Sequence, residues 1–368
     1  MNRGTLSMNR RSQAVFLLLA LVTALAAPAR AATYHIRWYL GHKNLDYFEE
    51  AARDFKKVVE TGSKGDIDVT IVLKANDDPQ GPDHVSKIAA EVASGKIEMG
   101  HSFLDVMGDP RLHAFEAPYL MRNYRHVEGV IEGPVGANLL AGLQPQGLKG
   151  LSFTFSGGAN GIATVDRPLR TPEDLKGLKI GCYGDSVDQA WLKSLGAIPV
   201  PIGRHLGSIA SMARRGQLDG VIITWRNFER ESLDTAFNYF NLPNSSYLLT
   251  VTYINKKYFE SMPKAYRDLI SKASIEAARV ERARTIELNE DARREEVSKG
   301  VRAVYLTDAN RRRFVAALKP VYKNVIDGVL GRALIQKIEN TKDAPENPLI
   351  PEALARSTQL AKALKASE

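Results

Sequence analysis

The pattern that decides the fold lies in residues 34–73, YHIRWYLGHKNLDYFEEAARDFKKVVETGSKGDIDVTIVL. Its first seven residues are largely apolar and aromatic, and they predict a strand over 34–40. Residues 45–60 have a helical period, with an apolar face made of Phe48, Ala51, Ala52, Phe55 and Val58. Residues 66–73 alternate apolar and polar side chains and predict a second strand. A strand, a helix and a strand in this order form one unit of a parallel sheet.

The same alternation continues along the chain. A helix over 85–94 and a strand over 99–103 extend the first unit. A second unit is predicted from strands over 151–155, 178–182 and 220–224 and helices over 186–195 and 207–215. The apolar run 248–254 is expected to return the chain to the first sheet. We therefore expect an α/β protein with two lobes, each built on a mostly parallel sheet.

A long helix is predicted over 263–300, where Gly300 is a natural stop. At ~1.5 Å per residue it would reach ~57 Å, which is longer than one lobe is wide, so we expect it to brace both lobes. A strand is expected over 301–307. The proline-containing tail after it, with Pro345, Pro348 and Pro351, is expected to wrap over the surface or to be partly mobile.

The N-terminus predicts export. Arg3, Arg10 and Arg11 precede an apolar run over 14–27, and a small-residue cleavage site follows at 29–31. The run would span only ~21 Å as a helix, less than the ~30 Å hydrocarbon core of a bilayer. We therefore interpret residues 1–31 as a cleavable signal peptide, and the protein as a soluble one that acts outside the cytoplasm.

Charge and cysteine content narrow the function classes. Removing residues 1–31 takes away four arginines and no acidic residue, so the net charge falls from +8 to +4. Basic and acidic residues are interspersed through the rest, without the concentrated basic stripe that nucleic-acid binding requires, so no nucleic-acid partner is expected. Cys182 is the single cysteine, so no internal disulfide can form, and we expect it to be a small buried apolar residue.

One segment carries a family resemblance. Residues 167–180, RPLRTPEDLKGLKI, make physical sense alone, because Thr171 can cap a short helix that Pro172 opens and Gly177 ends. The segment resembles one found in the extracytoplasmic solute-binding proteins of tripartite ATP-independent periplasmic (TRAP) transporters. Four more stretches resemble that family in order and spacing: 94–100, 117–120, 195–201 and 215–220.

The resemblance implies a two-lobed periplasmic binding protein fold and a receptor that closes around a small organic solute. It also implies delivery of the solute to a TRAP membrane permease, with no cofactor, no metal and no catalysis. A receptor without a lipid tether fits the periplasm. The expected lobes are residues 32–154 plus about 245–280, and residues 155–244 plus about 281–368.

The family's usual carboxylate anchors are replaced in this sequence. The family arginine in the strand after G-L-K-I falls on Gly181, a second arginine falls on Asn160, and an asparagine falls on Ile223. Gly181 and the glycine-rich stretch 156–161 predict a larger and less cationic pocket in which the backbone can approach a ligand. We therefore expect a ligand that is neutral, aromatic or only weakly anionic, rather than a simple dicarboxylate.

Further candidate contacts follow strand ends, where binding residues gather. In the second lobe they are Tyr183, Trp225, Arg226 and Asn227; in the first they are His42, Lys43, Asn76 and Phe103. Trp225 can stack on a ring or an apolar ligand, and Arg226 can supply a displaced positive charge. The alternatives are a lobe-packing role for Trp225, a solvated charge for Arg226, and helix capping or surface exposure for His42.

Two other functions were compared with transport. A periplasmic hydrolase lacks support, because the seven histidines form no His-x-x-x-His pair and no Gly-x-Ser-x-Gly elbow occurs. A ligand-sensing partner of a membrane receptor also fits a divergent pocket. Neighbouring genes separate the two, since permease genes favour transport and a sensor kinase gene favours signalling.

Overall fold

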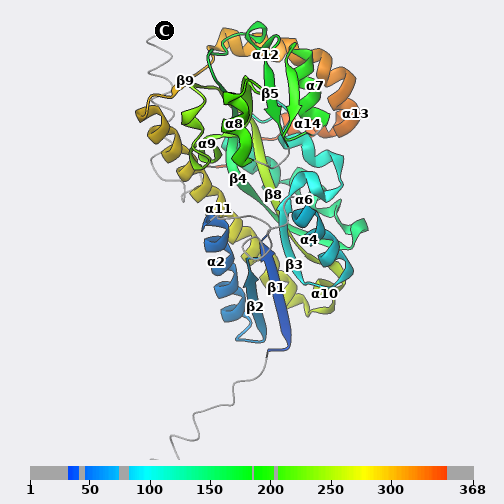
Figure 1. Cartoon of the computed structure of the whole chain (residues 1–368). Helices are drawn as coiled ribbons and strands as arrows, with labels where there is room; N and C mark the ends of the chain where they lie inside the picture. The colour runs from blue at the N-terminus through cyan, green and yellow to red at the C-terminus, as the bar shows by residue number, and fades with distance from the viewer. Residues whose placement is uncertain (1–31, 41–45, 74–82, 185, 203–205, 346–368) are drawn as a thin grey trace, which may run out of the picture.

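The computed structural model describes residues 32–40, 46–73, 83–184, 186–202 and 206–345 (Figure 1). The strands are β1 (Tyr34–Leu40), β2 (Ile67–Val72), β3 (Met99–Phe103), β4 (Leu148–Thr164), β5 (Lys179–Cys182), β6 (Ile198–Pro201), β7 (Gly220–Thr224), β8 (Tyr239–Asn255) and β9 (Arg302–Val304). The expected strands over 34–40, 99–103 and 220–224 are confirmed to the residue. The signal peptide prediction lies outside the described residues.

The helices complete an α/β fold. They are α2 (Asp46–Gly62), α4 (Asp83–Ser94), α5 (Tyr124–Glu132), α6 (Pro134–Ala141), α7 (Ser186–Ser194), α8 (Ile209–Arg214), α9 (Trp225–Arg230), α10 (Lys256–Ser261), α11 (Lys264–Ser298), α12 (Asp308–Val321), α13 (Asp327–Leu330) and α14 (Arg332–Glu339). None of the helices in the described part of the chain is long and apolar enough to span a membrane.

All the strands join one sheet in the order β2-β1-β3-β8-β4-β7-β5-β6, with β9 beside β8. The outer strands are parallel, as expected, but the centre is not: β8 is antiparallel to β3 and β4, and β4 is antiparallel to β7. Because β4 and β8 are seventeen residues long, they run through both halves of the molecule. The expected strand over 151–155 is therefore only part of β4.

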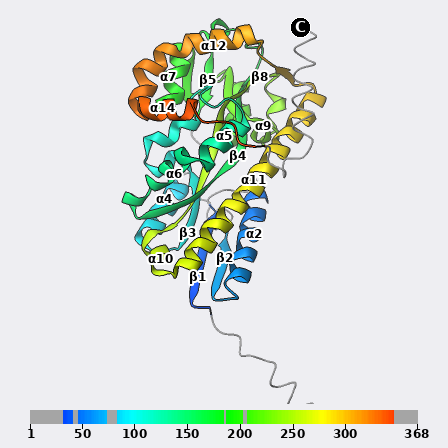
Figure 2. The ribbon, with the colours of Figure 1, turned by 180° about the vertical axis from the view of Figure 1, so that it is seen from behind.

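We call the half with β1, β2, β3, α2 and α4 lobe I, and the half with β5, β6, β7, α7, α8 and α9 lobe II (Figure 1). The run over 248–254 does return to the first sheet, because β8 pairs with β3. The long helix α11 has 35 residues and crosses the back of both halves, where it contacts α2, β4 and α9 (Figure 2). The bracing role predicted for this helix is confirmed.

Helix α2 contributes one of its faces to the hydrophobic core of lobe I. Val59 is fully buried, whereas Val58 is 39% exposed, so the expectation that Val58 lies on the apolar face is wrong. Val59 lies four residues after Phe55 and eleven after Phe48, a spacing that returns to the same helix face. This face packs with α11 against the sheet of lobe I.

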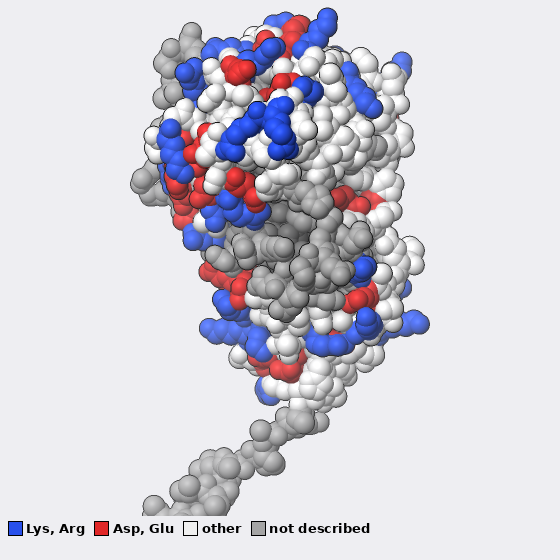
Figure 3. Space-filling model, viewed as in Figure 1, with Lys and Arg blue, Asp and Glu red and all other residues white. Residues whose placement is uncertain are grey.

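Charges of both signs are interspersed over the face shown in Figure 3. This distribution agrees with the interspersed acidic and basic residues of the sequence. Cys182 is buried within an apolar cluster, as expected for a small apolar residue.

Candidate functional site

Asn160 lies in β4, at the centre of the sheet. It is 2% exposed, and its side-chain amide donates a hydrogen bond to the Ser246 hydroxyl at 3.2 Å. Its amide oxygen is buried and has no hydrogen-bond partner among the described residues. An amide placed in this way has one acceptor left for another molecule.

The glycines before Asn160 have a structural cause. Gly157 and Gly158 adopt φ of 85° and 82°, where glycine avoids the cost of a side chain. A Cβ at Gly157 would collide with Thr224, and one at Gly158 would collide with the Tyr124 hydroxyl. These glycines form a bulge between β4 and β8, and side chains of the chain itself occupy the space that was expected to admit a ligand.

Trp225 begins α9, directly after β7. It is 4% exposed, and its indole lies on the ring of Phe240 with centroids 3.7 Å apart. The indole nitrogen has no partner among the described residues. The structure thus shows the packing role of Trp225 that the sequence left as the alternative, together with one unused donor.

Arg226 and Asn227 follow in the first turn of α9. The Thr224 hydroxyl caps this helix by accepting from the Asn227 backbone N–H at 3.2 Å. Arg226 pairs with Glu229, and its backbone N–H donates to Asn289 of α11 at 3.0 Å. Its Nε is buried without a partner among the described residues. Arg226 is therefore neither a free surface charge nor fully paired.

Gly181 lies in β5 between two apolar neighbours. A Cβ at this position would lie 3.2 Å from Val221 and 3.4 Å from Ile202. Ile223 belongs to the same apolar cluster, which also contains Trp225. Two of the three replaced family anchors, Gly181 and Ile223, therefore belong to an apolar wall of lobe II.

The other predicted contacts are spread out. Tyr183, just past β5, and Phe103, at the end of β3, are half-buried. His42, Lys43 and Asn76 lie outside the described residues. The structure brings Trp225, Arg226 and Asn227 together in one helical turn, and it places Phe103 in the other lobe.

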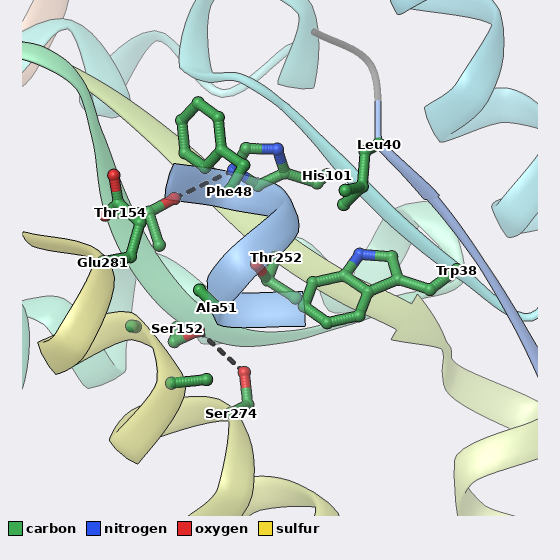
Figure 4. A pocket seen from close by; sticks show the side chains of 12 residues that line it. Trp38, Leu40, Phe48, Ala51, His101, Ser152, Thr154, Thr252, Ser274 and Glu281 are labelled. Atoms are coloured by element: carbon green, nitrogen blue, oxygen red, sulfur yellow. Dashed lines mark hydrogen bonds between the residues drawn. The ribbon is translucent and has the colours of Figure 1, made fainter. Parts of the chain in front are cut away.

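Lobe I contains a pocket that the sequence patterns did not reveal (Figure 4). It lies between the sheet and the helices α2 and α11. Its lining consists of Trp38, Leu40, Phe48, Ala51, His101, Ser152, Thr154, Thr252, Ser274, Ala277, Ala278 and Glu281. The sequence does hold one signal for this pocket, namely serine, threonine and histidine at alternate positions of its strands. A strand face that packs against helices is ordinarily apolar.

Several polar groups of this pocket are hydrogen-bonded to neighbouring side chains. The Nε2 atom of His101 lies 2.9 Å from the Thr154 hydroxyl and 3.0 Å from the Thr250 hydroxyl. The Ser152 and Ser274 hydroxyls are 2.7 Å apart. These bonds tie β3, β4 and β8 together and link β4 to α11.

Both titratable groups of the pocket are held in their neutral forms. Burial lowers the pKa of His101 to about 3. Burial also raises the pKa of Glu281 to about 8, although its oxygens accept hydrogen bonds from the Phe155 N–H and the Thr285 hydroxyl. The pocket is therefore polar but uncharged near neutral pH. No group of three or more metal-ligating side chains occurs among the residues that the structure describes.

Comparisons with known proteins agree with this architecture. A family model described as "DctP: Bacterial extracellular solute-binding protein, family 7" matches residues 41–328. The C4-dicarboxylate-binding periplasmic protein DctP of Rhodobacter capsulatus is 24% identical over 316 residues, which cover 84% of this chain and 92% of that protein. The 2,3-diketo-L-gulonate-binding periplasmic protein YiaO of Escherichia coli K12 is 24% identical over 317 residues, with the same coverage.

Solved structures share the fold. A TRAP periplasmic solute-binding protein from Chromohalobacter salexigens with bound D-glucuronate has a TM-score of 0.72 at 20% identity, covering 83% of this chain and 100% of that one. The sugar acid binding protein DctPAm from Advenella mimigardefordensis, in complex with galactonate, has a TM-score of 0.71 at 21% identity, covering 84% and 98%.

Proposed function

This chain belongs to family 7 of the bacterial extracellular solute-binding proteins, and from this premise we propose that it is a periplasmic TRAP receptor. It captures a small organic solute between its two lobes and delivers it to a TRAP-type membrane permease. We propose that the lobes divide within β4 and β8, near residues 154 and 245. Long strands shared by both lobes suit a hinge, because bending them moves one lobe relative to the other.

Three buried polar atoms carry this proposal. The Asn160 amide oxygen, the Trp225 indole nitrogen and the Arg226 Nε all lack partners among the described residues. A buried polar group left unpaired costs ~1–3 kcal/mol, so each is expected to find a partner. We assign these three atoms, with Tyr183 and Asn227, to the solute-facing side of lobe II, and His42, Lys43, Asn76 and Phe103 to that of lobe I.

The solute class follows from the apolar wall. Similar proteins are named for C4-dicarboxylates and 2,3-diketo-L-gulonate. In this chain the position that is an arginine in most of the family is Gly181, against Ile202 and Val221, and Ile223 lies in the same cluster. Such a wall favours an apolar or aromatic part of a ligand over a second carboxylate. We propose a solute that is neutral, aromatic or weakly anionic, with Arg226 available for one negative charge.

A solute panel tests the proposal. The protein is unfolded and refolded to remove any bound solute, and thermal shifts are measured with sugar acids, aromatic monoacids, neutral compounds and C4-dicarboxylates. We expect a shift with a member of the first three classes and none with succinate or malate. Tight succinate or malate binding by calorimetry would overturn the solute class, and no binding across a broad library would count against the receptor itself.

Asn160→Ala tests the lobe II contacts directly. We expect ~10-fold weaker binding of the solute found in the panel, because one hydrogen bond of about 1.5 kcal/mol is lost. Asn238→Ala is the matched control, since the Asn238 side-chain amide donates to the Val165 carbonyl at the surface. Equal affinities for the two variants would remove Asn160 from the site.

A further inference from the structure

The pocket of lobe I has a row of polar side chains where a sheet meets helices. Thr252 of β8 is paired with His101 of β3 on one side and with Ser152 of β4 on the other. Residues paired across neighbouring strands point to the same face of a sheet. This row therefore lies under α2 and α11, in a layer that is ordinarily apolar.

The helices leave space over this row because they present small side chains to it. Ala51 of α2 and Ala277 and Ala278 of α11 line the pocket. The space that remains admits about one water-sized group. A larger residue at any of these positions would have closed it.

Trp38 adds a donor that has no acceptor in the part of the chain that the structure describes. Its side chain lines the pocket and is 5% exposed, and its indole nitrogen has no partner among the described residues. Figure 4 shows the nitrogen on the ring edge nearer to the labelled Leu40 and His101. By contrast, the indole nitrogen of Trp191 donates to Asp188 at 3.1 Å, which is the usual state of a buried indole.

The chemistry of the lining selects an uncharged group. Hydroxyl groups, an indole N–H and neutral His101 surround the space, and Glu281 is protonated below about pH 8. An ion would meet no opposite charge there, whereas a hydroxyl can accept from the indole and donate to Thr252 or Ser152.

We propose that this pocket is a subsite for one uncharged hydroxyl group, filled by water in the free protein and by a hydroxyl of the solute in the loaded protein. The second half of this statement rests on the function proposed above. Leu40 is the last residue of β1, Phe48 lies in the first turn of α2, and His101 lies in the middle of β3, so the pocket extends inward from the carboxyl end of β1. Ligands of open α/β sheets bind at this edge.

A matched pair of variants tests the hydroxyl in solution. Trp38→Phe and Trp191→Phe remove the same atoms from buried sites. The two melting temperatures therefore compare the contributions of the two indole N–H groups to stability. If a water accepts from Trp38, Trp38→Phe lowers the melting temperature about as much as Trp191→Phe does. A neutral or stabilising Trp38→Phe would overturn the subsite, because it would mean that the indole N–H had no acceptor. Thr252→Val removes a lining hydroxyl at constant shape and should also lower the melting temperature.

Crystals of the exported protein distinguish the two sources of the hydroxyl. In buffer we expect one oxygen within hydrogen-bond distance of the Trp38 indole nitrogen, and under xenon pressure we expect no xenon there. In crystals transferred to ethylene glycol, a glycol hydroxyl should replace that oxygen. Xenon in the pocket would overturn the proposal, and a water that does not exchange would overturn its solute half. None of these measurements needs solute binding, so a failed solute panel would be a separate result.

Discussion

The indole of Trp225 lies flat against the ring of Phe240, with centroids 3.7 Å apart and an interplanar angle of 14°. The two rings join the start of α9 to β8 inside the apolar cluster of lobe II. An aromatic side chain expected from the sequence to stack on a ligand is thus stacked within the protein. One face of the indole is used in packing, and under the proposed function its nitrogen is the atom that contacts the solute.

Trp225 variants should separate packing from binding. Trp225→Ala should destabilise the protein by about 3–5 kcal/mol, because a large buried aromatic side chain is lost. Trp225→Phe should cost much less stability, yet weaken solute binding ~10-fold through loss of one hydrogen bond. Urea unfolding and calorimetry measure the two effects. Unchanged affinity in Trp225→Phe would leave Trp225 with packing alone.

Gly181→Arg should reduce both affinity and stability. Its Cβ would already meet Val221 and Ile202 at 3.2 and 3.4 Å, so a guanidinium would have to be placed beside an apolar cluster without a charged partner. Gly181→Ala is the control and should be close to neutral, since small shifts of the two side chains accommodate it. Thermal unfolding and titration with the solute test both variants. Wild-type affinity in Gly181→Arg would mean that the solute does not approach this wall.

Glu281 should make stability fall as the pH rises. Its pKa is raised to about 8 in the folded state by burial, while an unfolded Glu titrates near ~4.3. Between pH ~4.3 and about 8 the folded state therefore holds a proton that the unfolded state has released. The stabilising effect of this proton is complete below the unfolded pKa and is lost as the pH rises through the folded pKa. Urea unfolding of the wild type and Glu281→Gln from pH 5 to 9 checks this. As the pH rises, the free energy of unfolding of the wild type should fall relative to that of Glu281→Gln. A difference in unfolding free energy that does not change with pH would contradict the raised pKa.

Arg282 should matter far more than its neighbour Arg279. Arg282 is 2% exposed, donates to the Phe153 carbonyl at 2.9 Å, and pairs with the buried Glu128 and with Glu132. Arg282→Met would remove the guanidinium that faces the buried Glu128, and breaking a buried ion pair in this way costs about 3–5 kcal/mol. Arg279 also pairs with Glu132, but the Arg279 side chain is 48% exposed. Arg279→Met should therefore lower the free energy of unfolding by under ~1 kcal/mol. Similar losses in urea unfolding would contradict the difference in burial.

Much of the architecture could be predicted because it depends on local pattern. The strand at 34–40 and the long helix followed from side-chain period and stop signals, and the capping of the short helix by Thr171 is present as expected. The apolar pattern predicts only part of β4, because glycines in 156–161 interrupt it at the bulges. It predicts only part of β8, because residues 241–246, NLPNSS, have the composition of a loop. Family membership, indicated by five short motifs in order, was confirmed by the match over 41–328.

By itself the sequence determined the order of the elements, the family and the loss of the usual arginines, since all of these are read from neighbouring residues. Only the tertiary structure decided that Trp225 packs on Phe240 and that His101 meets Thr154 and Thr250. The physical reason is strand order: β8 lies between β3 and β4. Residues up to 149 positions apart in the chain thereby share one buried face, and no local pattern encodes which strands become neighbours.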